Sequence, residues 1–255
     1  MEYNYGVMES KVVLVTGVAG GIGSATASLF GKEGWHVIGV DRDESFPEAV
    51  DHFIQADISE AESSADIFRE VEAEEGRLDA LVNNAAIQIC KPIVEMSPNE
   101  WDATMASNLR SVFLAVRNAH SLLRSGGAIV NVSSVHAVAT SSEIAAYAAS
   151  KGGLLAFTRA LSIEFADDDI RVNAVLPGAV DTKMLRDGID RGHVGGESIE
   201  ELVRGLGARH VIGRVGQPEE IAQTILFLAD SSRSSFVTGQ ALTVDGGATA
   251  RLSTE

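Results

Sequence analysis

The sequence Lys11-Val-Val-Leu-Val-Thr-Gly-Val-Ala-Gly-Gly-Ile-Gly23 decides the fold of this chain. Residues 11–15 form a short apolar run rich in valine, which is typical of a buried strand. A cluster of glycines follows at once, and then an alanine-rich stretch, 24–33, that is typical of a helix. Residues 35–40 are again mostly apolar, and Asp41 closes them. The order strand, tight turn, helix, strand predicts one βαβ unit.

The glycines of this turn are suited to hold a phosphate group. Glycine lets the backbone turn tightly and approach a ligand closely, and the helix behind it presents free N–H groups and a positive dipole end. A glycine pattern alone is weakly specific, but its place between a strand and a helix makes it much more so. We therefore predict a dinucleotide pyrophosphate site built from Gly17, Gly20, Gly21, Ile22 and Gly23.

Asp41 ends the second predicted strand, where a βαβ dinucleotide site places its ribose-binding acid. A carboxylate there accepts hydrogen bonds from the ribose hydroxyls of NAD and repels the 2′-phosphate of NADP. NAD is therefore the predicted cofactor. Arg42 follows directly and is a second expected contact, although its charge also suits a phosphate. The alternative for Asp41 is an ordinary solvated aspartate at a strand end.

The alternation of strands and helices continues along the chain. Five more strands are predicted at 53–56, 80–82, 128–132, 172–176 and 241–244, and four more helices at 60–75, 98–123, 145–165 and 218–228. This pattern predicts an α/β protein with a Rossmann-type, doubly wound parallel sheet of about seven strands and helices on both faces. No repeat, linker or low-complexity tract divides the sequence, so residues 1–255 are expected to form a single domain.

Residues 183–213 interrupt this alternation with a segment rich in glycine and arginine. They include Gly188, Gly192, Gly195, Gly196, Gly205, Gly207, Gly213, Arg186, Arg191, Arg204 and Arg209. So long an insertion in a compact domain is usually functional or mobile. We interpret the segment as a substrate lid, and the alternative is a tolerated surface excursion.

Composition and charge restrict the partners. Apolar residues make up 45% and charged residues 22% of the chain, which is ordinary for a globular protein, and no apolar run is long enough to span a membrane. The formal net charge of −16 disfavours nucleic acid and anionic membrane surfaces. Cys90 is the only cysteine, which excludes an intramolecular disulfide and a cysteine-rich metal site. With a start that lacks a signal-peptide pattern, this favours a cytoplasmic protein with a small-molecule substrate and no metal.

Three polar residues are placed for proton transfer. Tyr147 and Lys151 are four residues apart in a predicted helix and share one face, and Ser134 follows a strand at the edge where open α/β sheets bind ligands. Hydride transfer between an alcohol and NAD also moves a proton at the oxygen. A free tyrosine has a pKa of about 10, and an adjacent ammonium lowers it. We predict Tyr147 as acid/base, Lys151 as the group that lowers its pKa and binds the nicotinamide ribose, and Ser134 as the holder of the substrate oxygen. The alternative is a packed tyrosine beside a surface lysine.

From about Lys11 to Gly247 the chain resembles the short-chain dehydrogenase/reductase family. The matching motifs are Thr16-Gly17-x-x-x-Gly21-x-Gly23, Asn83-Asn84-Ala85, Asn108, Ser134, Tyr147-x-x-x-Lys151, Pro177-Gly178 and the ending Val244-Asp-Gly-Gly247. The resemblance implies an NAD-dependent oxidoreductase that acts on CH–OH groups. One departure is Ala86, where the family usually has glycine.

The resemblance also implies roles for individual residues. Asn108 is implied to hold a proton-relay water and so to join Ser134, Tyr147 and Lys151 in the catalytic set. Cofactor contacts are implied for Asp57 and Ile58 at the adenine, Asn84 at the ribose, and Pro177, Gly178, Val180 and Thr182 at the nicotinamide. Because the family is usually oligomeric, a homo-oligomer, and by resemblance a homotetramer, is expected.

Gln88 and His136 are candidate substrate residues, beside Ser134 and Tyr147. Gln88 follows the Asn-Asn-Ala motif and His136 lies two residues after Ser134, and both resemble residues that bind the carboxylate in the family's 3-hydroxybutyrate dehydrogenases. Those enzymes also have a lysine three positions before the catalytic tyrosine, where this chain has Ile144. A hydroxy acid is therefore one candidate substrate, while sugars, polyols and diols stay open. For His136 the alternative is a polar pocket wall.

Two other functions share these features. A non-catalytic NAD(H)-binding sensor would have no need of the proton-transfer residues. An NADPH-dependent 3-oxoacyl carrier-protein ketoreductase would keep them, but Asp41 disfavours its cofactor and the acidic balance disfavours an acidic carrier protein. We therefore favour an NAD-dependent dehydrogenase of secondary alcohols.

Overall fold

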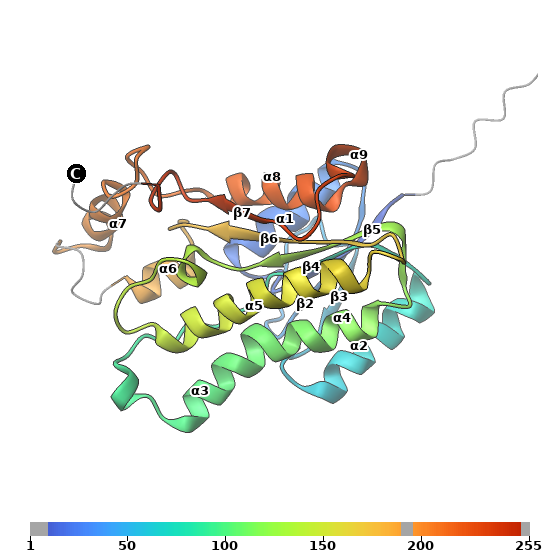
Figure 1. Cartoon of the computed structure of the whole chain (residues 1–255), viewed down its shortest axis with the longest axis horizontal. Helices are drawn as coiled ribbons and strands as arrows, with labels where there is room; N and C mark the ends of the chain where they lie inside the picture. Colours follow the sequence, from blue (N-terminus) through green and yellow to red (C-terminus); the bar gives the residue numbers. More distant parts are fainter. Residues whose placement is uncertain (1–9, 190–195, 251–255) are drawn as a thin grey trace, which may run out of the picture.

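The computed structural model describes residues 10–189 and 196–250. Seven strands form one parallel sheet in the order β3-β2-β1-β4-β5-β6-β7 (Figure 1). The strands are β1 (Val12–Thr16), β2 (His36–Asp41), β3 (His52–Gln55), β4 (Leu78–Asn83), β5 (Leu123–Val132), β6 (Arg171–Pro177) and β7 (Ala241–Val244). The chain runs outward from β1 in both directions, which confirms the doubly wound α/β fold predicted from the sequence.

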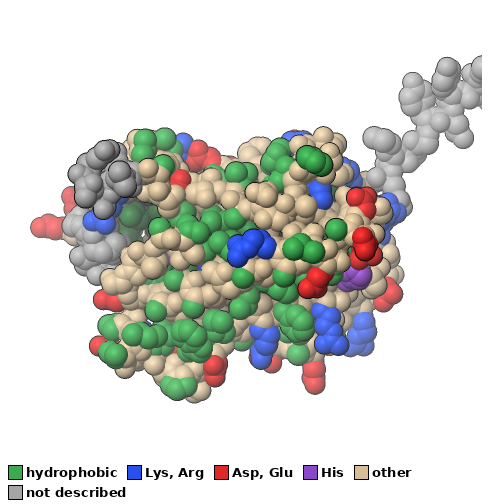
Figure 2. Space-filling model, viewed as in Figure 1, with side chains coloured by type: hydrophobic (Ala, Val, Ile, Leu, Met, Phe, Trp, Pro, Cys, Tyr) green, Lys and Arg blue, Asp and Glu red, His purple; other side chains and the backbone are tan. Residues whose placement is uncertain are grey.

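Two layers of helices cover the sheet (Figure 1). The helices are α1 (Gly21–Lys32), α2 (Ala61–Glu74), α3 (Pro98–Met105), α4 (Ser111–Ala119), α5 (Ala145–Glu164), α6 (Lys183–Gly188), α7 (Ile199–Gly207), α8 (Pro218–Ala229) and α9 (Ser231–Ser234), with short 3-10 turns η1 (Ile93–Glu95) and η3 (Val135–Ala137). α1 and α8 pack together on one face, while α2, α4 and α5 cover the other. Apolar side chains gather over α3, α4 and α5 on the outer face shown in Figure 2.

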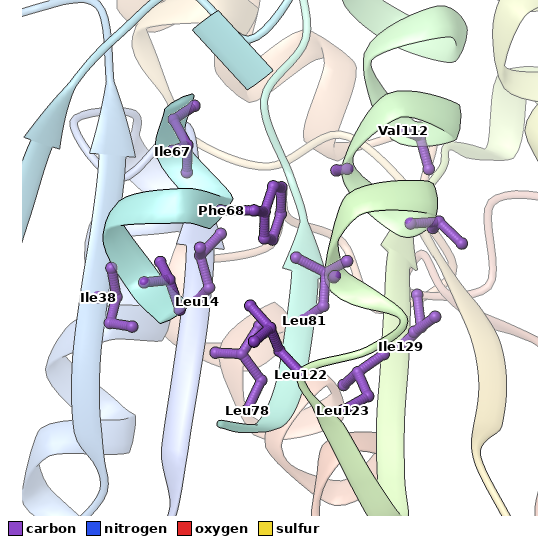
Figure 3. Close-up of a cluster of buried hydrophobic side chains, with 14 of the residues drawn as sticks. Leu14, Ile38, Ile67, Phe68, Leu78, Leu81, Val112, Leu122, Leu123 and Ile129 are labelled. Carbon is purple, nitrogen blue, oxygen red and sulfur yellow. The ribbon is translucent and has the colours of Figure 1, made fainter. Parts of the chain in front are cut away.

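Each face of the sheet has its own apolar core. Along β1, Leu14 belongs to the core beneath α2 and α4, and Val13 to the core beneath α1 and α8. Figure 3 shows Leu14 and Ile38 of the sheet against Ile67 and Phe68 of α2. Successive side chains of a strand point to opposite faces, so a strand covered on both faces is apolar at every position. This is why the strands read as continuous apolar runs.

The helix predicted over 98–123 is divided in the structure. α3 is followed by a π-helical turn, η2 (Ala106–Arg110), and α4 then ends at Ala119. Leu122 and Leu123 extend the apolar pattern but belong to the loop and to β5, where both pack into the core. Apolar periodicity cannot separate a helix end from a strand start when both side chains are buried.

The segment 183–213, which interrupts the alternation of strands and helices expected from the sequence, contains two helices in the structure. α6 and α7 lie together at one end of the molecule (Figure 1). Ile189 and Leu202 are buried against Val203 and Leu206, so this pair of helices has a small core of its own. Arg191, Gly192 and Gly195 of the original prediction lie outside the described residues. In the described part of the chain, no helix is long and apolar enough to cross a bilayer.

Candidate active site

A cavity of about 630 Å³ opens at the carboxyl ends of the strands. Its walls come from the loops that follow β1, β2, β3, β4, β5 and β6, and from α6 and α7. The residues predicted from the sequence that line it are Gly17, Gly20, Gly21, Ile22, Asp41, Arg42, Asp57, Ile58, Asn84, Gln88, Ser134, His136, Tyr147, Lys151, Pro177, Gly178, Val180 and Thr182. Gly23 and Asn108 are the two predicted residues absent from the lining.

The glycine turn is closely packed, and this explains why Gly23 is needed although it does not line the cavity. A Cβ atom added at Gly23 would lie 2.0 Å from the carbonyl oxygen of Gly17, which no side chain allows. Gly17 itself has a φ of +69°, and a Cβ there would lie 2.7 Å from the Cα of Ala85. Gly23 therefore closes the turn from behind, while Gly17, Gly20 and Gly21 form the surface of the cavity.

The N-terminus of α1 faces the cavity without a side-chain cap. Its N-cap residue is Gly20, no side chain accepts from the first-turn N–H groups, and no acidic residue stands in the first turn. By contrast, Ser97 caps α3 and Ser198 caps α7 through hydrogen bonds. Uncapped N–H groups and a positive dipole end suit an anionic pyrophosphate, so the residues present fit a dinucleotide.

Asp41 is held in a defined position at the end of β2. Its Oδ2 accepts a hydrogen bond from the backbone N–H of Ala19 at 2.9 Å, and its Oδ1 accepts one from the N–H of Asp43 at 3.1 Å. The first bond ties the carboxylate to the glycine turn. Carboxylate oxygens have further lone pairs, so both can still accept from a ribose.

Asn84 links β4 to the glycine turn. Its amide nitrogen donates to the carbonyl oxygens of Thr16 and Gly17, each at 3.0 Å, and its backbone N–H donates to the Thr16 hydroxyl. Both side-chain N–H groups are thus used inside the protein. Asn84 lines the cavity as predicted, but its donors hold the turn in place.

Tyr147 and Lys151 lie together on the buried face of α5. The Nζ of Lys151 is 5.6 Å from the centre of the Tyr147 ring and donates to the carbonyl oxygen of Val132 at 2.7 Å. Ser134, just beyond β5, forms a side-chain hydrogen bond with Tyr147. The three side chains that the sequence predicted as a set therefore meet at one point of the cavity.

Burial controls the protonation of this cluster. It raises the pKa of Tyr147 to about 12, against the hydrogen bond of Ser134, which lowers it. Burial also lowers the pKa of Lys151 to about 8. The sequence predicted a lowered pKa for Tyr147, whereas the protein groups alone raise it, because desolvation of a phenolate is the largest effect on this buried ring.

Asn108 lies behind the cavity in the π-helical turn η2, fully buried. Its Oδ1 accepts from the N–H of Ile87 at 2.8 Å, and its Nδ2 donates to the carbonyl oxygen of Ile87 and to the Ser150 hydroxyl. The Ser150 hydroxyl in turn donates to the carbonyl oxygen of Tyr147 at 2.7 Å. Both amide N–H groups of Asn108 are used, so the side chain joins the loop after β4 to α5 and has no donor left for a water.

His136 and Gln88 also line the cavity. The His136 ring stands edge-on to Tyr147 with 6.1 Å between ring centres, and its Nδ1 lies 3.2 Å from the Thr140 hydroxyl. Gln88 donates to the Cys90 sulfur at 3.1 Å, and its amide lies near the backbone of Gly188 at the end of α6. His136 therefore lies beside Tyr147, and Gln88 lies beside the end of α6.

The segment 183–213 contributes wall residues, most of which the sequence did not single out. They are Lys183, Met184, Leu185, Gly188, Ile189, Leu206, Arg209 and His210, with Ala248 from the turn after β7. Arg209 and Gly188 were noted only as members of a glycine- and arginine-rich segment. The other wall residues could be anticipated only from the position of this segment in the chain, because no local sequence pattern shows which of its side chains face the cavity.

The geometry defines a class of protein. A parallel sheet has an uncapped helix N-terminus, an anchored carboxylate and a tyrosine–lysine–serine cluster around one cavity at its carboxyl edge. This is the arrangement of a dinucleotide-binding protein of the α/β class.

Comparisons with known proteins agree. A family model described as enoyl-(acyl carrier protein) reductase matches residues 17–249. The chain is 38% identical over 257 residues to cyclopentanol dehydrogenase from Comamonas sp., covering 96% of this chain and 99% of that protein. It is 37% identical over 254 residues to the 3-oxoacyl-(acyl-carrier-protein) reductase FabG from Thermotoga maritima, covering 94% and 98%. The structure of Thermoplasma acidophilum aldohexose dehydrogenase is similar with a TM-score of 0.89 and 32% identity, covering 96% of each chain.

This chain belongs to the short-chain dehydrogenase/reductase family. It is accordingly an oxidoreductase acting on CH–OH groups, with a nicotinamide cofactor, NAD or NADP, and a small-molecule substrate.

Proposed function

We propose that the protein is an NAD-dependent dehydrogenase that interconverts a small secondary alcohol and its ketone, with Tyr147 as acid/base. The observation that carries this proposal is the meeting of Tyr147, Lys151 and Ser134 in the same cavity as Asp41 and the glycine turn. The substrate classes consistent with this site are sugars, polyols, diols and hydroxy acids.

The proposed roles follow from the contacts of each side chain. NAD, when bound, supplies the hydride acceptor. Tyr147 takes the proton from the substrate hydroxyl as hydride leaves the carbon, and the hydroxyl of Ser134 holds the same oxygen. A pKa of about 8 leaves Lys151 largely protonated at pH 7, so its positive charge favours the phenolate form of Tyr147, which is the form that accepts the proton. Its remaining N–H groups can donate to the nicotinamide ribose. Asn108 keeps α5 and the loop at Ile87 in register for these contacts.

The choice of NAD over NADP is supported by Asp41. The bond to Ala19 fixes the carboxylate beside the glycine turn, where the adenosine ribose is expected, and a fixed negative charge repels a 2′-phosphate. Arg42 also lines the cavity and is the feature that favours NADP. The proposed contacts of Asp57, Ile58, Pro177, Gly178, Val180 and Thr182 with the cofactor are supported by their place in the cavity lining.

The second candidate is an NADPH-dependent ketoreductase of carrier-protein substrates. The similarity to FabG and the description of the family model favour it. The similarity to cyclopentanol dehydrogenase and aldohexose dehydrogenase favours a free alcohol or sugar. The third candidate function is a non-catalytic NAD(H) sensor, which would have no use for the cluster of Tyr147, Lys151 and Ser134.

Steady-state kinetics separate these candidates. The oxidation of secondary alcohols, polyols, sugars and hydroxy acids is followed by NADH absorbance, with NAD and NADP compared for each active substrate. We expect turnover of a free alcohol with a clear preference for NAD. Turnover only of acyl-thioester ketones with NADPH would support the ketoreductase instead, and cofactor binding without turnover of any substrate would support the sensor.

We also propose a homo-oligomer, by family resemblance a tetramer. The apolar face over α4 and α5 supports it (Figure 2): Phe113 is 47% exposed, and Met105, Leu109 and Phe157 line a shallow depression beside it. Sedimentation equilibrium of the purified protein measures the mass directly, and a monomer at micromolar concentration would contradict this expectation. The single cysteine, Cys90, supports a reducing compartment such as the cytoplasm.

A further inference from the structure

Gly188 is the last residue of α6 and lines the cavity. It is not one of the glycines with a positive φ, so its backbone conformation is open to other residues. Alanine also favours a helix more than glycine does. Neither the backbone nor the helix therefore requires a glycine at this position, and the reason for it lies in the neighbouring side chains.

A side chain at this position would meet two groups of the loop after β4. A Cβ atom added at Gly188 would lie 3.3 Å from the Nε2 of Gln88, which is tighter than an ordinary contact, and 3.7 Å from the Sγ of Cys90. The Gln88 amide in turn donates a hydrogen bond of 3.1 Å to the Cys90 sulfur. The amide therefore cannot retreat toward Cys90, because the thiol already fills that side.

This contact lies close to the proposed acid/base. Gln88, Gly188 and Tyr147 all line one cavity. The Cys90 thiol, to which the Gln88 amide is bonded, is near enough to Tyr147 that a negative charge on the thiol raises the pKa of the phenol. The contact between α6 and Gln88 is therefore in the part of the cavity where the alcohol is expected.

We propose that Gly188, through its contact with Gln88, determines the size of the alcohol that the cavity accepts beside Tyr147. This inference rests on the proposed dehydrogenase function and adds a specificity-determining residue to it. With glycine at this position, the Gln88 amide packs against α6 and Cys90. With a larger residue, the amide is displaced into the cavity, and a bulky substituent on the alcohol carbon no longer fits.

A double-mutant cycle separates this role from a general effect on the fold. Gly188→Ala adds the methyl group that is too close to the amide, Gln88→Ala removes the amide, and the double variant carries both changes. Gly31→Ala in α1 is the matched control. A Cβ atom there would also lie 3.3 Å from its nearest neighbour, the Cβ of Ala49, but Gly31 is not among the residues that line the cavity.

The measurement is kcat/KM with NAD for cyclohexanol as the bulky probe and for 2-butanol as the small one. We expect Gly188→Ala to lower the ratio of cyclohexanol to 2-butanol by about 10-fold or more, the order of one extra methylene in an apolar pocket. Gln88→Ala should raise this ratio. When residue 88 is already alanine, Gly188→Ala should change the ratio by less than about 3-fold.

Two further measurements complete the experiment. Gly31→Ala should leave the ratio of cyclohexanol to 2-butanol unchanged, whatever it does to stability. The affinity for NAD, measured by calorimetry, should be the same in the unmodified enzyme and in all four variants, because no substitution falls in the glycine turn or at Asp41.

Three results would overturn the inference. They are a ratio of cyclohexanol to 2-butanol that Gly188→Ala leaves unchanged, an equal loss of activity with both alcohols in that variant, and the same fall in the ratio whether residue 88 is glutamine or alanine. In each case the unmodified enzyme still oxidises the alcohols with NAD, so the proposed function survives. Failure of the unmodified protein to oxidise either alcohol, with cofactor binding intact, would contradict the dehydrogenase function and the role of Gly188 together.

Discussion

At the scale of single residues, the buried ammonium of Lys151, which we propose to assist proton transfer, also affects stability. The side chain is 2% exposed, and burial lowers its pKa from 10.5 to about 8. A depressed pKa means that the folded protein binds this proton more weakly than the unfolded chain does. The contribution of Lys151 to stability is then complete above pH 10.5 and is lost as the pH falls through about 8.

Replacing this lysine tests the sign of that linkage. Between pH 8 and pH 9.5 the free energy of unfolding of the unmodified protein should rise by about 2 kcal/mol relative to Lys151→Met, because the variant has no ammonium to desolvate. Lys151→Met should also be the more stable protein at pH 7, although inactive. Urea unfolding at each pH measures the difference. Lys32→Met, on an exposed lysine, should show no such trend, and a flat difference for Lys151→Met would contradict the account. Above pH 10 the raised pKa of Tyr147 acts in the opposite direction, so the comparison ends below it.

Asp41 is the residue on which cofactor choice depends. Asp41→Asn keeps an acceptor for the N–H of Ala19 or Asp43 but removes the charge. We expect the ratio of kcat/KM for NAD to that for NADP to fall by about 10- to 100-fold, since hydrogen bonds to a charged group are the stronger ones. Asp51→Asn is the matched control, because Asp51 accepts the N–H of Val37 at the far end of β2. Equal efficiency of both cofactors with the unmodified enzyme would show that Asp41 does not select NAD.

At the scale of elements, the π-helical turn η2 presents Asn108 to two neighbours at once. Asn108→Ala would remove the hydrogen bonds to the N–H and C=O of Ile87 and the donor to the Ser150 hydroxyl, which would keep only its bond to the carbonyl oxygen of Tyr147. We expect a loss of stability on the order of 3 kcal/mol and a lower kcat, because α5 and the loop after β4 are no longer tied together. The control is Asn118→Ala, which removes a single hydrogen bond from α4 to Ser64 of α2. It should lower the free energy of unfolding by about 1 kcal/mol or less and leave kcat unchanged. Equal effects of the two variants on stability and kcat would contradict the proposal that Asn108 ties α5 to the loop after β4.

We propose that α6 and α7 form a lid over the cavity, so their mobility should depend on ligand. α6 and α7 share a core of only a few side chains, centred on Ile189 and Leu202, so their amides should exchange faster than those of the sheet. Hydrogen exchange should show both helices protected when NAD and an active alcohol are added, because Met184, Leu206 and their neighbours line the cavity. α8 serves as the internal reference. An exchange pattern of α6 and α7 that is the same with and without ligand would make them a surface excursion.

The sequence predicted most of the elements because the central strands are buried on both faces and the covering helices each have an apolar face. The prediction was wrong where a helix and a strand have the same apolar sequence pattern. The apolar run through Leu122 and Leu123 continued a helix in the prediction and starts a strand in the structure. α7 was not predicted, because glycines surround its apolar stripe of Ile199, Leu202 and Leu206 and disfavour a helix by composition.

The candidate site was predictable where residues sit at strand ends or at helical spacing. Gly17, Asp41, Ser134, Tyr147 and Lys151 are of this kind, and the sheet brings all of them to one cavity. His210 was not predictable, because its burial depends on contacts with a turn more than thirty residues further along the chain. The direction of the Tyr147 pKa was missed for a related reason, since spacing identifies a neighbour but gives no information on how deeply the pair is buried.

At the scale of the whole molecule, the polar residues of the candidate site lie at one edge of an apolar sheet, in a chain with a net charge of −16. An anionic dinucleotide must therefore be held by local dipoles, those of the uncapped α1 N-terminus and the glycine turn. We therefore expect Tyr147 to be dispensable for cofactor binding, whereas Lys151 is proposed to serve both cofactor binding and proton transfer.

Turnover by a folded Tyr147→Phe variant tests this account most directly. The substitution removes one oxygen from a packed ring and leaves the glycine turn and Asp41 intact, so NAD binding, measured by calorimetry, should persist. With the proton acceptor gone, kcat for the best alcohol should fall by at least about 10²- to 10⁴-fold. A Tyr147→Phe variant that binds NAD and turns over at a near-normal rate would mean that the acid/base lies elsewhere, and would contradict the central claim.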